Sequence, residues 1–85
     1  MKPVTVYTKP GCPYCLRALR LLADKGAEVS EIVASRDPKT KEEMVSRSGG
    51  KVTFPQIFVG DTHVGGCDDL IALDRRGQLD GLLAA

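Results

Sequence analysis

The chain has 85 residues, and its 12 basic and 11 acidic side chains nearly cancel. That length fits one small domain, which we expect to span residues 1–85. The apolar runs are far shorter than the roughly 20 residues that cross a bilayer, and the N-terminus lacks the apolar stretch of a secretory signal. The near-neutral charge and the scarcity of aromatic residues argue against nucleic-acid binding. Three cysteines are too few for a secreted disulfide framework.

The first half of the chain predicts a strand, a helix and a second strand. Val4–Thr8 is rich in β-branched residues and lies between prolines, so it predicts a strand. Pro13–Lys25 carries apolar residues at helical spacing, and Gly26 ends the pattern. Ala27–Ala34 predicts the second strand. The side chains expected on the buried face of the helix are Leu16, Leu19, Leu22 and Ala23.

The second half predicts a helix, a hairpin and a last helix. Asp37 is expected to cap a helix that starts at Pro38 and runs to about Ser48. Thr53–Val59 and Thr62–Val64 predict two strands of a hairpin. The last helix is expected over Cys67–Arg76. A final docked turn is expected at Leu79, Leu82 and Leu83.

The predicted order is therefore β-α-β-α-β-β-α. A strand, a helix and a strand in succession give a parallel pair with a right-handed crossover, and the hairpin adds two antiparallel strands. We expect an α/β fold with a four-stranded mixed sheet and helices on both faces.

Two cysteines occur as Cys12-Pro13-Tyr14-Cys15, where the first predicted helix begins. Cys12 is expected at the N-cap, where its sulfur meets the unpaired backbone N–H groups and the positive end of the helix dipole. Both effects favour a thiolate, and the charge of Lys9 supports it. Cys15 lies almost one turn further on, where we expect it to be more buried and less ionised. The pattern indicates redox chemistry with Cys12 as nucleophile and Cys15 as resolving thiol.

Two other interpretations of the cysteines remain open from the residues alone. Cys12, Cys15, His63 and Cys67 form a nominal set of zinc ligands, but the 47 residues between Cys15 and His63 are unlike the usual spacing of zinc sites. The pair could also be inert and buried. Since a Cys-x-x-Cys pair at a helix N-terminus is hard to keep unreactive, we expect redox chemistry and no metal.

Three sequence blocks, Tyr7–Cys15, Thr53–Gly60 and His63–Leu70, resemble those of the small dithiol glutaredoxins in order and separation. The resemblance covers nearly the whole chain. It implies a thioredoxin fold and a glutathione-dependent thiol–disulfide oxidoreductase that reduces protein disulfides and protein–glutathione mixed disulfides. Cys12 and Cys15 are the catalytic residues that it implies.

The resemblance also implies a glutathione site. The Phe54–Pro55 bond is expected to be cis, with the backbone of Phe54 pairing with the tripeptide. Lys9 and Gln56 are expected near the glycine carboxylate, and Asp68 near the γ-glutamyl ammonium group. His63 is expected to be a surface or packing residue. The residues expected to bind glutathione are Lys9, Tyr14, Thr53, Phe54, Pro55, Gln56, Gly66, Cys67 and Asp68.

Further expectations concern the cellular role. Glutathione is the expected co-substrate, and the partners are disulfide-containing or glutathionylated proteins, with ribonucleotide reductase as a family-level example. We expect a cytoplasmic monomer that acts in cell redox homeostasis. A carrier of an iron–sulfur cluster is the competing class, but the family's carriers generally have one cysteine in a Gly-Phe-Ser context, unlike Pro13-Tyr14 here. A redoxin that is reduced by thioredoxin reductase is a second alternative.

Overall fold

The strands and helices follow one another in the predicted order, with one additional short helix at the end. A computed structural model describes residues 1–84 of the chain. The additional helix is the predicted docked turn, in which Leu79 and Leu83 are buried. The elements are β1 (Val4–Thr8), α1 (Pro13–Asp24), β2 (Val29–Val33), α2 (Pro38–Arg47), β3 (Gln56–Val59), β4 (Thr62–Gly65), α3 (Cys67–Arg75) and α4 (Leu79–Leu83).

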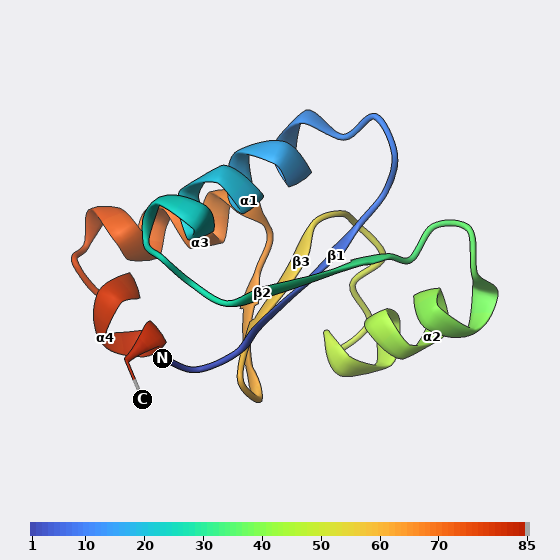
Figure 1. Cartoon of the computed structure of the whole chain (residues 1–85). Coiled ribbons are helices and arrows are strands. Elements are labelled where there is room, and N and C mark those ends of the chain that lie inside the picture. Colours follow the sequence, from blue (N-terminus) through green and yellow to red (C-terminus); the bar gives the residue numbers. More distant parts are fainter. Residues whose placement is uncertain (85) are drawn as a thin grey trace.

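The four strands form one mixed sheet in the order β2-β1-β3-β4 (Figure 1). β1 pairs with β2 in parallel, as expected for two strands that are joined through a helix. β3 is antiparallel to β1 and to β4, so the predicted hairpin is present. Because β1 and β3 are neighbours that run in opposite directions, the segment after β1 and the segment before β3 lie at the same end of the sheet.

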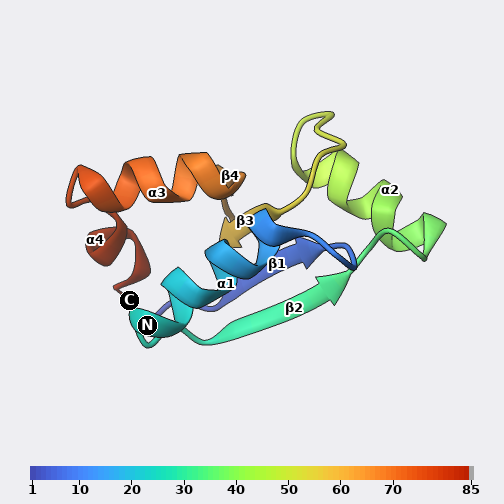
Figure 2. The ribbon, with the colours of Figure 1, turned by 90° about the horizontal axis from the view of Figure 1, so that it is seen from above.

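Helices cover both faces of the sheet, as predicted. Val4 and Val6 face one side of β1 and join a core cluster with Leu22 of α1 and Leu70 of α3. These two helices lie side by side over that face (Figures 1 and 2). Tyr7 faces the other side and packs in a second cluster, to which α2 contributes Met44. The alternation of side chains along β1 thus supplies both cores.

One face prediction is wrong. Leu16 was expected on the buried face of α1, but its side chain is 65% exposed. The helix buries Cys15, Ala18 and Leu22 instead. At 100° per residue these three form one stripe, and Leu16 lies about 120° from Leu22 around the helix. The predicted buried face was therefore rotated around the helix axis from the observed one, which contains Cys15. Ala23, which was also predicted on the buried face, is exposed for the same reason.

Two strands are shorter than predicted. The third strand was expected from Thr53 but begins at Gln56, where its pairing with β1 also ends. Pro55 has no N–H to donate to a strand ladder, so the chain before it remains a loop. The second strand, expected from Ala27, begins at Val29. The late start of β3 leaves residues 48–55 as a loop between α2 and β3.

The C-terminal helix is tied to the start of the chain and to α1. The backbone N–H of Lys2 donates to the carbonyl of Leu83 at 2.8 Å. At the end of α1, Lys25 Nζ lies 2.8 Å from an oxygen of Asp74 and 3.0 Å from an oxygen of Asp80. These contacts place α4 beside the N-terminus (Figure 2). Across residues 1–84, every helix is too short or too polar to span a membrane.

Candidate active site

Cys12 caps the N-terminus of α1, as predicted. Its backbone is extended, with φ −105° and ψ 103°, and Pro13 is the first residue of the helix. The backbone N–H of Cys15 donates to Cys12 Sγ at 3.2 Å. A sulfur in this position accepts from one of the otherwise unpaired N–H groups and faces the positive end of the helix dipole. Both interactions stabilise a negative charge on the sulfur of Cys12.

Cys15 is a buried thiol that stays protonated at neutral pH. Burial, followed by the side-chain hydrogen bond with Cys12, raises the pKa of Cys15 from 9.0 to about 11. The negative charge on Cys12 adds to this rise, while the charge of Lys9 opposes it. The predicted contrast in burial between the two cysteines is small, since Cys12 is 5% and Cys15 3% exposed. Both sit at the junction of α1 with the sheet.

The third cysteine lies near the first. Cys67 is the first residue of α3 and is buried. Burial raises its pKa, and the charges of Asp68 and Cys12 raise it further, against the opposing charge of Arg17. All three cysteines are free thiols. The N-termini of α1 and α3 therefore bring three sulfurs to one end of the molecule.

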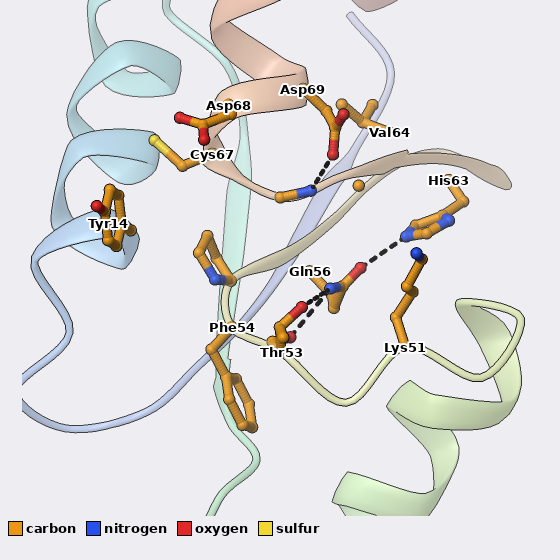
Figure 3. Close-up of a pocket in the computed structure, with 13 residues that line it drawn as sticks. Tyr14, Lys51, Thr53, Phe54, Gln56, His63, Val64, Cys67, Asp68 and Asp69 are labelled. Atoms are coloured by element: carbon orange, nitrogen blue, oxygen red, sulfur yellow. Dashed lines mark hydrogen bonds between the residues drawn. The ribbon is translucent and has the colours of Figure 1, made fainter.

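A groove of about 470 Å³ opens beside these helix ends. Tyr14 and Asp68 lie at one end of it and Lys51 and His63 at the other, with the loop before β3 between them (Figure 3). The residues that line it are Tyr14, Lys51, Thr53, Phe54, Pro55, Gln56, His63, Val64, Gly65, Gly66, Cys67, Asp68 and Asp69.

The groove brings together eight of the nine residues that were predicted to bind glutathione. The exception is Lys9, which lies outside the lining, with its Nζ 6.0 Å from the centre of the Phe54 ring. That ring points away from the middle of the groove (Figure 3) and packs against the core cluster of Tyr7 and Met44. Phe54 therefore presents its backbone rather than its side chain to the groove.

Several lining residues were not predicted from the sequence, and Lys51 is the one among them with a positive charge. It lies two residues before Thr53, just ahead of the second sequence block. This closeness to a predicted binding segment is the signal that could have identified it. His63 was expected to be a surface or packing residue; it is half-buried and stacks on Phe58, and it also lines the groove. Its partner could not be predicted from the sequence, because the contact crosses between two strands.

The loop before β3 is held by the side chain of Gln56. The amide nitrogen of Gln56 donates to the carbonyl oxygen of Thr53 at 3.0 Å and to its hydroxyl at 3.1 Å. The amide oxygen lies 2.7 Å from His63 Nε2. The Phe54–Pro55 peptide bond in this loop is cis, as the resemblance implied. Within residues 1–84, neither backbone polar group of Phe54 has a hydrogen-bond partner.

The opposite wall of the groove is the start of α3. The carboxylate of Asp69 accepts from the backbone N–H of Gly66 at 2.9 Å and so caps the helix. Gly65 has φ +115°, and a Cβ there would lie 2.3 Å from the Asp69 carboxylate. Asp68, by contrast, is exposed at the edge of the groove (Figure 3). The two neighbouring acids thus do different things: Asp69 holds the helix and Asp68 faces the groove.

The four nominal zinc ligands do not meet. In residues 1–84, no group of three or more His, Cys, Asp or Glu side chains is placed to hold one metal ion. His63 lies at the far end of the groove from Cys67 (Figure 3). What the arrangement offers chemically is a capped sulfur, a second thiol within reach of it and a groove lined by Lys51 and Asp68.

Comparison with known proteins agrees with this geometry. Residues 4–64 match the family model for glutaredoxin. The chain is 52% identical to a glutaredoxin of Pseudomonas aeruginosa over 85 residues, all of both chains. The solution structure of glutaredoxin from Brucella melitensis is 61% identical, with a TM-score of 0.84 over 98% of this chain and 89% of that one. The buckwheat glutaredoxin–glutathione complex is 29% identical, with a TM-score of 0.84 over 96% and 76% of the two chains.

These matches confirm the predicted thioredoxin fold. The chain belongs to the glutaredoxin family of thiol–disulfide oxidoreductases.

Proposed function

We propose that the protein reduces protein disulfides and protein–glutathione mixed disulfides with glutathione as reductant, and so contributes to cell redox homeostasis. The observation that carries the proposal is the sulfur of Cys12, which caps α1 beside a groove with Lys51 at one end and Asp68 at the other. Glutathione is an extended tripeptide with two carboxylates and one ammonium group, and the groove offers a partner for each.

The first step is attack of the Cys12 thiolate on the glutathione sulfur of a mixed disulfide. A new disulfide forms between Cys12 and glutathione, and the protein thiolate leaves and takes a proton from solvent. A second glutathione thiolate then attacks the glutathione sulfur bound to Cys12. That step releases oxidised glutathione and restores the Cys12 thiolate, so Cys15 is not required for this substrate.

A protein disulfide requires both cysteines. Attack by Cys12 gives a mixed disulfide with the substrate protein, and Cys15 then attacks Cys12 and releases the reduced protein. Cys15 must first lose its proton. Since the negative charge on Cys12 helps to raise the pKa of Cys15, formation of the mixed disulfide removes that contribution and favours the Cys15 thiolate. The resulting Cys12–Cys15 disulfide is reduced by two molecules of glutathione.

The groove supports binding of glutathione through four groups of contacts. Phe54 has unpaired backbone N–H and C=O groups, which suit the extended cysteine residue of the tripeptide. Lys9 and Lys51 flank the loop and suit the glycine carboxylate. The N–H of Cys67 at the start of α3, with Asp68, suits the γ-glutamyl carboxylate and ammonium groups. Tyr14, Thr53 and Pro55 supply the walls. The related buckwheat protein was solved as a complex with glutathione, which supports this choice of ligand.

We further propose that the protein acts as a monomer in the cytoplasm, where a reduced glutathione pool keeps the dithiol reduced. Its substrates are disulfide-containing or glutathionylated proteins, and ribonucleotide reductase is one candidate partner. The supply of electrons distinguishes this proposal from a redoxin that depends on thioredoxin reductase.

The test is turnover of a glutathionylated peptide in the presence of glutathione, glutathione reductase and NADPH. Wild type and Cys15→Ser are expected to consume NADPH, and Cys12→Ser is expected to be inactive. Full activity of Cys12→Ser would contradict the proposal. Activity of the wild type with thioredoxin reductase but not with glutathione would instead identify the alternative reductant.

A further inference from the structure

A chain of side-chain contacts runs from β4 through β3 to the loop that faces the groove. His63 of β4 meets the amide oxygen of Gln56, and the amide nitrogen of Gln56 holds Thr53 at two atoms (Figure 3). Gln56 is only 2% exposed, whereas Thr53 lies on the surface. Every polar atom of the buried amide is therefore occupied within the protein, and the contacts connect the interior of the sheet to a surface loop.

The contacts determine which atom carries each proton. Because the nitrogen of the Gln56 amide donates to the two oxygens of Thr53, the amide oxygen must be the atom that faces His63. An amide oxygen only accepts, so the N–H that it receives belongs to His63 Nε2, 2.7 Å away. His63 is thus a donor at Nε2 in either protonation state. A reversed amide would place its oxygen against the carbonyl oxygen of Thr53 and lose that contact.

The imidazole ring of His63 packs on an aromatic side chain of β3. Its ring stacks on Phe58 with centroids 4.8 Å apart and planes at 30°. The guanidinium of Arg47 lies 4.2 Å from the centre of the same Phe58 ring, and Arg47 donates to the hydroxyl of Tyr7 at 2.9 Å. Phe58 of β3 therefore supports the imidazole directly, and Arg47 of α2 and Tyr7 of β1 pack against Phe58 in turn.

We propose that His63 is a positioning residue for the substrate loop: it orients the amide of Gln56, which holds Thr53 and thereby sets the backbone of Phe54 for pairing with glutathione. The inference rests on the proposed function, since it names the residue that prepares the glutathione site. It also assigns Gln56 a supporting role, because its amide nitrogen already binds Thr53 at two atoms. The ligand contact then falls to the backbone of Phe54, and His63 acts on binding rather than on the thiol chemistry.

The test compares three variants at the same position. His63→Phe keeps a ring on Phe58 and removes the donor. His63→Gln keeps a donor near the position of Nε2, and His63→Asn places one too close to the backbone to reach Gln56. We measure KM and kcat for a glutathionylated peptide, the free energy of unfolding, and the rate at which iodoacetamide alkylates Cys12.

His63→Phe is expected to raise KM for the glutathionylated peptide about two- to tenfold, the loss of one hydrogen bond at a preorganised site. Its kcat and its rate of alkylation are expected to match wild type, because the Cys12 cap is untouched. His63→Gln is expected to restore much of the KM, and His63→Asn is not. An unchanged KM in His63→Phe, or a loss of stability with no change in KM, overturns the proposal.

A second measurement does not depend on turnover. The chain has one histidine, so its imidazole ¹⁵N signals are unambiguous. We expect the neutral ring to carry its proton on Nε2, and we expect loss of the dispersed Gln56 amide signals in His63→Phe. A neutral ring with its proton on Nδ1 contradicts the inference even if glutathione turnover is confirmed. Conversely, absence of glutathione turnover in wild type with the expected ¹⁵N spectrum refutes the proposed function. The hydrogen bonds among His63, Gln56 and Thr53 would then stand without a role in glutathione binding.

Discussion

The backbone N–H of Cys15 donates to the sulfur of Cys12 at 3.2 Å, so the two residues of the proposed dithiol are already in contact before any substrate binds. The contact is a helix cap, and it places one sulfur at the positive end of α1 while the other remains a buried thiol within the first turn. The difference between nucleophile and resolving thiol thus comes from position along one helix, since no neighbouring base is needed.

This arrangement predicts selective alkylation. With a pKa of about 11, Cys15 is ionised in only about one molecule in 10⁴ at pH 7. Brief treatment with iodoacetamide at pH 7 should therefore label Cys12 and leave Cys15 unmodified, as peptide mapping by mass spectrometry would show. Labelling of Cys15 should increase steeply only toward pH 11. Equal labelling of the two cysteines at pH 7 contradicts this assignment.

The same thiol predicts how stability depends on pH. The folded protein holds the Cys15 proton up to a pH of about 11, whereas the unfolded chain releases it near 9.0. The folded state therefore binds more protons in this interval, and the free energy of unfolding should fall as the pH rises from about 9 to about 11. Urea denaturation across this range measures the slope. Cys15→Ala should reduce the slope, and an identical slope in that variant would show that other groups cause it.

Gly65 is predicted to be irreplaceable where the groove meets α3. A Cβ at this position would lie 2.3 Å from the Asp69 carboxylate that caps the helix, and the backbone has φ +115°. Gly65→Ala should therefore lose the cap and also strain the backbone, at a cost of about 2–4 kcal/mol in the free energy of unfolding. Gly77→Ala is the matched control, since Gly77 has φ +70° and a Cβ added there would meet no atom within 4 Å.

The control should lose about 1 kcal/mol, the cost of the backbone conformation alone. Denaturation by urea gives both values, and KM for a glutathionylated peptide should rise only in Gly65→Ala. Equal losses in the two variants would mean that the contact with Asp69 is not what requires glycine.

Two lysines are predicted to share the attraction for the substrate carboxylate. Lys51 lines the groove, and Lys9 lies outside it, with its Nζ 6.0 Å from the centre of the Phe54 ring. Lys9→Ala and Lys51→Ala should each raise KM for a glutathionylated peptide about two- to fivefold, with kcat unchanged. The dependence of KM on salt concentration should weaken in both variants. Lys41→Ala removes an exposed charge from α2 and should change neither quantity. A change in KM of the same size in Lys41→Ala would point to net charge instead.

Much of the fold could be predicted from local sequence signals. The cap at Cys12, the cap at Asp37 with Pro38, and the hairpin between β3 and β4 each depend on a few adjacent residues, and all three are confirmed. The buried face of α1 was harder to predict. Leucines occur around most of this helix, and the choice among them depends on which stripe the sheet covers, as the exposed Leu16 shows.

The candidate site, like the fold, could be predicted only in part from the sequence. Eight of the nine residues expected at the glutathione site line one groove, because the blocks that contain them lie at the ends of β1, β3 and β4, which the sheet brings together. Lys51 and the pairing of His63 with Gln56 were not predicted from the sequence. Each depends on how a loop or a neighbouring strand folds back, and no spacing along the chain encodes that contact.

The most direct test of Cys12 as the attacking thiol is to trap the first covalent intermediate. Cys15→Ser should react with one equivalent of oxidised glutathione, release one glutathione, and carry a single glutathione adduct, which peptide mapping by mass spectrometry should place on Cys12. The same treatment of Cys12→Ser should give no adduct at a comparable rate. An adduct that forms first on Cys67, or equal reactivity of Cys12→Ser, would show that Cys12 is not the nucleophile.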